Sequence, residues 1–111
     1  MLTRLIALVA LLALTACEQT SRAVDTAARN SAKVAVNEAL VTRFPLVPKE
    51  LTTPFTDCVI DNASANEIGE LARDALIGVT DTTAALVRTV LERPETQQCV
   101  IRAGATVLDT L

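Results

Sequence analysis

The chain of 111 residues has no histidine, no tryptophan and no tyrosine, and two phenylalanines are its only aromatic residues. Without histidine it cannot form a Ser-His-Asp or Cys-His catalytic pair, a histidine-ligated haem site or a zinc site with imidazole ligands. The scarcity of aromatic rings and the net charge of −3 argue against a nucleic-acid partner. We therefore expect no enzymatic activity, no cofactor and no bound metal.

The length allows a single domain, and half of the residues are apolar, which is enough for a small hydrophobic core. Apolar residues recur at spacings of three and four, and no stretch alternates apolar with polar residues over a strand's length. The expected fold class is all-α. We expect one long N-terminal helix followed by a small bundle of short helices.

The first residues have the organisation of an export signal. Arg4 supplies a positive charge, and residues 5–14 form an uninterrupted apolar segment. That segment has the length of a signal-peptide core and is shorter than the roughly 20 residues that span a bilayer. The apolar segment stops just before Cys17, and polar residues follow it.

The sequence Leu14-Thr15-Ala16-Cys17 resembles the lipobox of bacterial lipoproteins. The resemblance implies that residues 1–16 are a signal peptide removed by cleavage, that Cys17 carries glycerolipid on its sulfur, and that its new amino group is acylated, typically with palmitate. Two or three acyl chains would hold the protein on a bilayer, at the periplasmic face of a bacterial membrane. Glu18, where an aspartate would favour the inner membrane, indicates the outer membrane. An ordinary secretory signal and a retained single-span anchor are the alternatives.

Two cysteines remain if Cys17 is lipidated. In an oxidising compartment such an even pair predicts a disulfide, here between Cys58 and Cys99. The bond would close a loop of about 42 residues and stabilise the fold by about 4 kcal/mol. A redox-active pair and a two-cysteine metal site are the alternatives, although no close C-x-x-C motif supports either.

Residues 17–44 are expected to form a tether and a long amphipathic helix over 20–44, capped by Thr20 or Ser21. One helical face is rich in alanine. That face comprises Ala28, Ala32, Ala35, Val36, Ala39, Leu40 and Phe44. It is expected to pack on the rest of the domain or, alternatively, to bind an envelope protein through residues 28–44. Asp25, Arg29, Lys33 and Asn37 lie on the other side.

Pro45 and Pro48 predict an extended linker over residues 45–53, and a helical domain over 54–111. Within that domain we expect three or four short helices. Their predicted starts are Thr53-Pro54, Ser64 with Glu67 as a capping box, Thr80 or Asp81, and Pro94. Gly78 and Gly104 are expected to end the second and fourth of these helices.

The second of these helices is expected to bury an apolar stripe that consists of Ile68, Leu71, Ala72, Ala75 and Leu76. Its charged residues are expected to be solvated: Glu67, Glu70, Arg73 and Asp74. Asp57 and Asp61, which flank Cys58 at helical spacing, are also expected to be solvated rather than catalytic, because paired carboxylates need burial to separate their pKa values.

Two passages resemble each other: Pro54-Phe55-Thr56-Asp57-Cys58-Val59-Ile60 and Pro94-Glu95-Thr96-Gln97-Gln98-Cys99-Val100-Ile101. Proline, threonine and Cys-Val-Ile recur, with one residue more between threonine and cysteine in the second copy. Two helices built alike and joined face to face would bring the two cysteines together. Chance similarity is the alternative.

Two further resemblances suggest functions. The export signal is similar to that of entericidin-type lipoproteins, which would imply a stress-related or membrane-perturbing role. The body resembles short helical bacterial proteins that sometimes carry the name succinate dehydrogenase, through Arg43-Phe44-Pro45, Asp57-Cys58-Val59-Ile60-Asp61-Asn62-Ala63 and Arg93-Pro94-Glu95-Thr96. With no dinucleotide-binding motif and no set of four cysteines, the latter would imply an accessory protein without catalytic residues. The expected function is a non-catalytic structural or accessory subunit of a cell-envelope complex.

Overall fold

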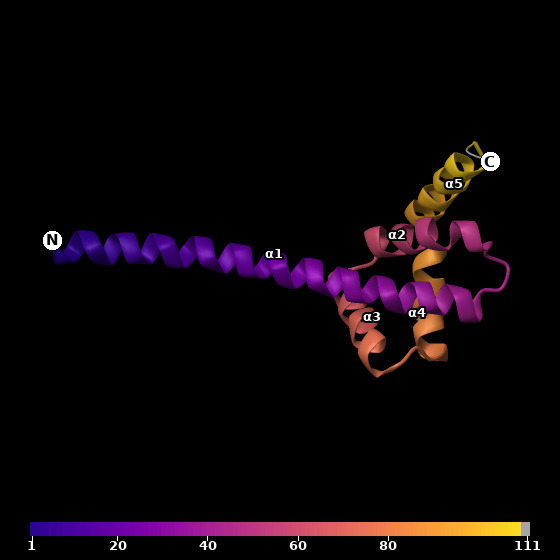
Figure 1. The fold of residues 1–111 in the computed structure, drawn as a ribbon, viewed down its shortest axis with the longest axis horizontal. Helices are drawn as coiled ribbons and strands as arrows, with labels where there is room; N and C mark the ends of the chain where they lie inside the picture. Colours follow the sequence, from indigo (N-terminus) through magenta and orange to yellow (C-terminus); the bar gives the residue numbers. More distant parts are fainter. Residues whose placement is uncertain (110–111) are drawn as a thin grey trace.

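The computed structural model describes the backbone of residues 1–109 and the side chains of residues 1–11, 24–107 and 109. Within this part the chain is all-α, as predicted, and contains no strand. The elements are α1 (Leu2–Arg43), the 3₁₀ helix η1 (Lys49–Leu51), α2 (Thr52–Asn62), α3 (Ala65–Ile77), α4 (Asp81–Leu91) and α5 (Pro94–Asp109). Helices α2, α3 and α4 pack on the C-terminal part of α1, and α5 packs on α2, while the N-terminal part of α1 projects alone (Figure 1).

The expectation of a long N-terminal helix over 20–44 is confirmed only in part, because α1 contains 42 residues and begins at Leu2. The predicted cap at Thr20 or Ser21 is therefore wrong. No proline or glycine occurs within α1, and its alanine and leucine residues have high helix propensity, so nothing in the backbone forces a start at residue 20. The C-terminal end agrees with the prediction to one residue, since Phe44 precedes Pro45.

The C-terminal part of α1 belongs to the core. Ala32, Ala35, Val36 and Ala39 are fully buried, and Leu40 is 1% exposed. Small alanine side chains let neighbouring helices approach closely, and α1 packs most extensively on α3, then on α2 and α4. The predicted packing of this face within the domain is confirmed. In this conformation the other helices cover the face. Binding of an envelope protein through residues 28–44 is untested and stays a prediction.

Residues 45–53 are not the extended linker that was expected. Pro48 is extended, with φ −60° and ψ 146°, but Lys49–Leu51 form η1 and α2 already begins at Thr52. The predicted start at Thr53-Pro54 came two residues too late because proline is tolerated throughout the first turn of a helix, where its missing N–H has no intrahelical partner.

The start and end of α3 match the prediction. Ser64 is the N-cap, and Gly78, with φ 117°, follows the last residue Ile77. Ile68 and Leu71 are buried, and Ala72 and Ala75 are partly buried. Leu76, however, is 86% exposed, because it follows Leu71 by five residues and so lies about 140° around the helix from that buried side chain.

Helix α5 does not end at Gly104 but continues to Asp109. A glycine inside a helix costs only about 1 kcal/mol relative to alanine, so it does not by itself end one. Residues 105–109, which lie beyond the predicted helix end at Gly104, are thus helical. None of the described side chains after Cys99 in α5 is fully buried, and Ile101 is 70% exposed.

The projecting part of α1 makes the molecule elongated, with extents of 67 × 34 × 22 Å. In the described part of the chain, no helix combines the length and the apolar character needed to cross a membrane.

Candidate functional site

The connection between α2 and α3 carries several side-chain hydrogen bonds. Ala63 and Ser64 are extended and turn the chain between the two helices. The Ser64 hydroxyl accepts a hydrogen bond from the Glu67 N–H at 3.2 Å, and the Glu67 carboxylate accepts one from the Ser64 N–H at 2.8 Å. This confirms the predicted capping box, which satisfies two backbone donors at the start of α3.

Arg93, between α4 and α5, fixes this connection from the other side. Its guanidinium donates two hydrogen bonds to the Glu67 carboxylate, at 2.7 and 2.6 Å, and a third to the Asn62 carbonyl at 3.0 Å. The Glu67 side chain is only 15% exposed, so the prediction that it is solvated is wrong. Sequence periodicity could not reveal a pair of residues 26 positions apart, although each lies at a recognisable helix start.

These contacts control the ionisation of Glu67. The hydrogen bonds from Arg93, followed by those from the Ser64 cap, lower the pKa of Glu67 from 4.5 to about 2, against the opposing effect of burial. The Glu67 carboxylate in turn raises the pKa of Arg93. A carboxylate with so low a pKa is ionised near neutrality and is poorly matched to general acid or base catalysis there. The pair therefore joins helices rather than transferring protons.

The acids beside Cys58 pair with cations of α1. Arg29 donates to the Asp61 carboxylate at 2.9 Å, and the Lys33 ammonium lies 3.2 Å from the Asp57 carboxylate. All four side chains are more than 40% exposed, which confirms that the two aspartates are solvated. Exposed ion pairs of this kind contribute between about 0 and 1 kcal/mol each.

Asp74 is a second acidic residue of α3 that was expected to be solvated but is hydrogen-bonded within the protein. Its carboxylate accepts a hydrogen bond of 2.7 Å from the Thr83 hydroxyl, and that hydroxyl accepts one of 3.1 Å from the Thr80 N–H. Thr83 is fully buried. This chain of bonds holds the end of α3 against the start of α4, where the sequence placed a helix start at Thr80 or Asp81.

The predicted disulfide is present. Cys58 of α2 and Cys99 of α5 are bonded, with their Cα atoms 5.6 Å apart and 41 positions apart in the sequence. A redox-active pair stays an untested alternative. No group of three or more potential metal-ligating side chains occurs among the described residues. The predicted lipidation site, Cys17, has its backbone in α1, but its side chain lies outside those described.

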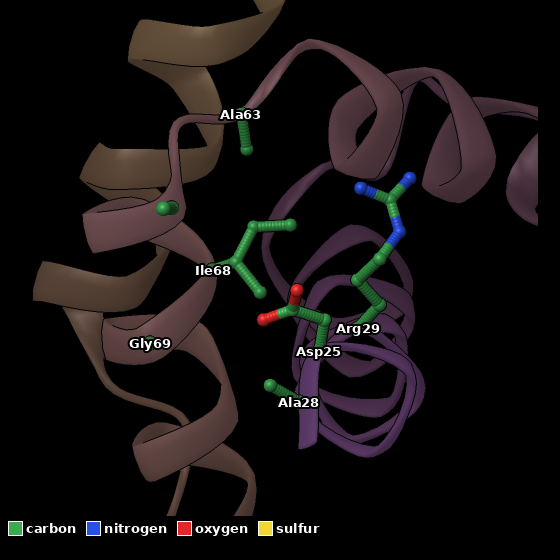
Figure 2. A pocket seen from close by; sticks show the side chains of 7 residues that line it. Asp25, Ala28, Arg29, Ala63, Ile68 and Gly69 are labelled. Carbon is green, nitrogen blue, oxygen red and sulfur yellow. The ribbon is translucent and has the colours of Figure 1, made fainter. Parts of the chain in front are cut away.

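A depression lies where α1 leaves the bundle, and it is a candidate binding site. It has a volume of about 350 Å³ and is lined by Asp25, Ala28 and Arg29 of α1 and by Ala63, Ala65, Ile68 and Gly69 around the α2–α3 connection. Figure 2 shows the Asp25 carboxylate pointing toward Ile68, while the Arg29 side chain extends away from Asp25. The sequence placed Asp25 and Arg29 on the polar face of α1 but gave no signal that α3 lies opposite them.

Comparison with known proteins adds no relative: the chain matches no protein family, no curated protein and no solved structure. Function must be inferred from the residues and the geometry described above.

Proposed function

We propose that the protein is a non-catalytic lipoprotein that is anchored through acylated Cys17 at the periplasmic face of the outer membrane and serves as a structural or accessory subunit of an envelope complex. The observation that carries this proposal is the Cys58–Cys99 disulfide. Structural disulfides persist in oxidising compartments outside the cytosol. The pairing leaves Cys17 as the third cysteine, directly after an apolar export segment and in the position that a lipobox requires.

The continuity of α1 supports a structural role. After cleavage before Cys17, the mature chain would begin within α1, whose backbone is helical without interruption from there to the core. Ala28, which packs against the core cluster, lies about 16 Å along the helix from Cys17 at 1.5 Å per residue. The bundle would then stand on a helical stalk instead of a flexible linker, so the membrane anchor would restrict its orientation.

The charged residues also support a non-catalytic role. The two described groups with shifted pKa values, Glu67 and Arg93, satisfy each other and tie three helices together. The fully buried Thr83 hydroxyl is engaged in holding α3 against α4. Catalytic groups generally have pKa values close to the pH at which they work, and they face a cavity.

Intact mass spectrometry of the protein purified from bacterial membranes tests the anchor. We expect a chain that begins at Cys17, carries a diacylglyceryl group and an additional acyl chain, and contains one disulfide. Cys17→Ser is the matched control and should yield an unlipidated chain. A full-length, unlipidated wild-type protein in the cytosolic fraction would refute the proposal.

Native mass spectrometry of the acylated protein tests the accessory role. We expect a complex with a partner at fixed stoichiometry, whereas a clean monomer would contradict that role. Toxicity on overexpression that disappears in Cys17→Ser would instead support the entericidin-type alternative. A visible absorption band from flavin, haem or an iron–sulfur cluster in the purified protein would contradict the non-catalytic assignment.

A further inference from the structure

The glycine at position 69 is the starting point for assigning a ligand site to the depression between α1 and α3. It lies in the middle of α3, where glycine costs about 1 kcal/mol relative to alanine. Its φ is not positive, and a Cβ atom added there would meet nothing within 4 Å. The fold therefore does not require glycine at this position. What glycine does maintain is open space above the floor of the depression, beside Ile68 and Ala65.

The rim of the depression carries one charge of each sign. Asp25 and Arg29 are four residues apart and lie on the same side of α1 (Figure 2). Asp25 is exposed and makes no ion pair with any residue whose side chain is described. Arg29 donates through one terminal nitrogen to Asp61, which leaves other guanidinium N–H groups available. Asp25 and Arg29 thus form no ion pair with each other; Arg29 is paired with Asp61, and its remaining N–H groups are the ones that a ligand can contact.

We propose that this depression binds a phosphoethanolamine group, and that the source of this group is the headgroup of phosphatidylethanolamine in the membrane. Asp25 would accept hydrogen bonds from the primary ammonium, Arg29 would donate to the phosphate, and the glycerol and first methylenes would lie on Ala28 and Ile68. Arg–phosphate and ammonium–carboxylate contacts are strong because both partners are charged.

The position of the depression favours a lipid as the source. Asp25 lies eight residues after Cys17 in the same helix, which corresponds to about 12 Å. This step rests on the proposed function, because acylation at Cys17 is what would bring the depression close to the headgroups. A tilt of α1 toward the bilayer would close the remaining distance.

The small number of glycines provides a selective measurement. The chain has three glycines, so ¹⁵N-glycine labelling gives one amide signal each for Gly69, Gly78 and Gly104. The labelled full chain is placed in phosphatidylcholine nanodiscs, and phosphatidylethanolamine then replaces a growing share of the lipid. We expect the Gly69 signal to shift saturably while those of Gly78 and Gly104 stay in place. Phosphatidylcholine is the matched ligand control, since its quaternary ammonium cannot donate a hydrogen bond to Asp25.

Variants test the assigned contacts. Asp25→Asn should weaken the response about tenfold, whereas Asp109→Asn, which changes an exposed aspartate at the end of α5, should not. Ala65→Leu, which fills the depression and keeps the Gly69 reporter, should abolish the response. Gly69→Ala should raise stability, since nothing lies within 4 Å of the added Cβ. Equal responses of the wild type and Asp25→Asn would overturn the assignment.

Water-soluble glycerophosphoethanolamine distinguishes the sources. A Gly69 shift with the lipid alone supports a headgroup site, and a shift with both shows that the phosphoethanolamine group itself is recognised. A Gly69 shift with the soluble compound alone would overturn the lipid source. No Gly69 shift in a protein shown to be acylated at Cys17 overturns this inference but not the proposed function. If the chain proves to be unlipidated but binds the soluble compound, the proposed function is overturned, whereas recognition of the phosphoethanolamine group is not.

Discussion

Arg93 and Glu67 form a two-point ion pair that joins the α4–α5 junction to the first turn of α3. A single carboxylate thus completes the helix cap at Ser64 and receives the guanidinium. Because Arg93 also donates to the Asn62 carbonyl at the end of α2, four helices meet around one charged contact. This contact ties down the α2–α3 connection, whose Ala63 and Ala65 line the depression beside α1.

Glu67→Gln should lower the free energy of unfolding at pH 7 by about 2 kcal/mol, the range for a hydrogen bond to a charged group. The folded-state pKa of about 2 lies below the ordinary value of 4.5. The stabilisation by ionised Glu67 is therefore fully present above about pH 5 and is lost as the pH falls toward 2. Urea unfolding over this range should show the wild type and Glu67→Gln converging. Glu70→Gln, on the exposed side of α3, should change stability by less than about 0.5 kcal/mol.

Replacing both Cys58 and Cys99 with alanine should lower the free energy of unfolding by about 4 kcal/mol, because the bond closes a loop between residues 41 positions apart. The pair is changed together so that no free thiol remains. Urea unfolding of the oxidised wild type and the double variant measures the difference. Cys17→Ser, a cysteine replacement outside the bond, should leave the midpoint unchanged. A double variant as stable as the wild type would mean that Arg93 and the core hold α5 without the bond.

Local signals in the sequence predicted the starts of α3, α4 and α5, whereas the predicted start of α1 was wrong and that of α2 came two residues too late. Ser64 and Pro94 act within their own turns, so their roles follow from neighbouring residues. Gly104 was misread because a glycine ends a helix through a positive φ, which Gly78 adopts and Gly104 does not. The pairing of Arg93 with Glu67 and the position of α3 opposite Asp25 depend on the tertiary arrangement. Helical periodicity carries no information about either.

Leu71 and Leu76 show within one helix that periodicity alone does not predict burial, and they provide a matched test. Both belong to the apolar stripe predicted for α3, yet Leu71 is fully buried and Leu76 is 86% exposed. Leu71→Ala should lower the free energy of unfolding by about 2 to 5 kcal/mol, since it removes core contacts and leaves a cavity. Leu76→Ala should change it by less than about 0.5 kcal/mol. Similar losses in urea unfolding would place another element over the end of α3 in solution.

The repeated Pro-Thr-Cys-Val-Ile pattern has a structural counterpart in two buried hydroxyls. Thr56 and Thr96 occupy the same place after their prolines, and they are 4% and 0% exposed. Neither hydroxyl has a hydrogen-bond partner among the described residues. The two copies differ at their isoleucines, because Ile60 is fully buried whereas Ile101 is 70% exposed. The resemblance therefore extends to the disulfide and the threonines but not to the packing of the following turn.

Valine has the shape of threonine without the hydroxyl, so Thr56→Val and Thr96→Val should each raise the free energy of unfolding by about 1 kcal/mol, the lower part of the penalty for a buried unsatisfied polar group. Thr89→Val is the control, since Thr89 is exposed and its hydroxyl donates to the Ala85 carbonyl at 3.0 Å. That change should not stabilise the protein. If either buried substitution instead destabilises the protein in urea unfolding, its hydroxyl is hydrogen-bonded in solution, and the cavity around it must admit a partner such as water.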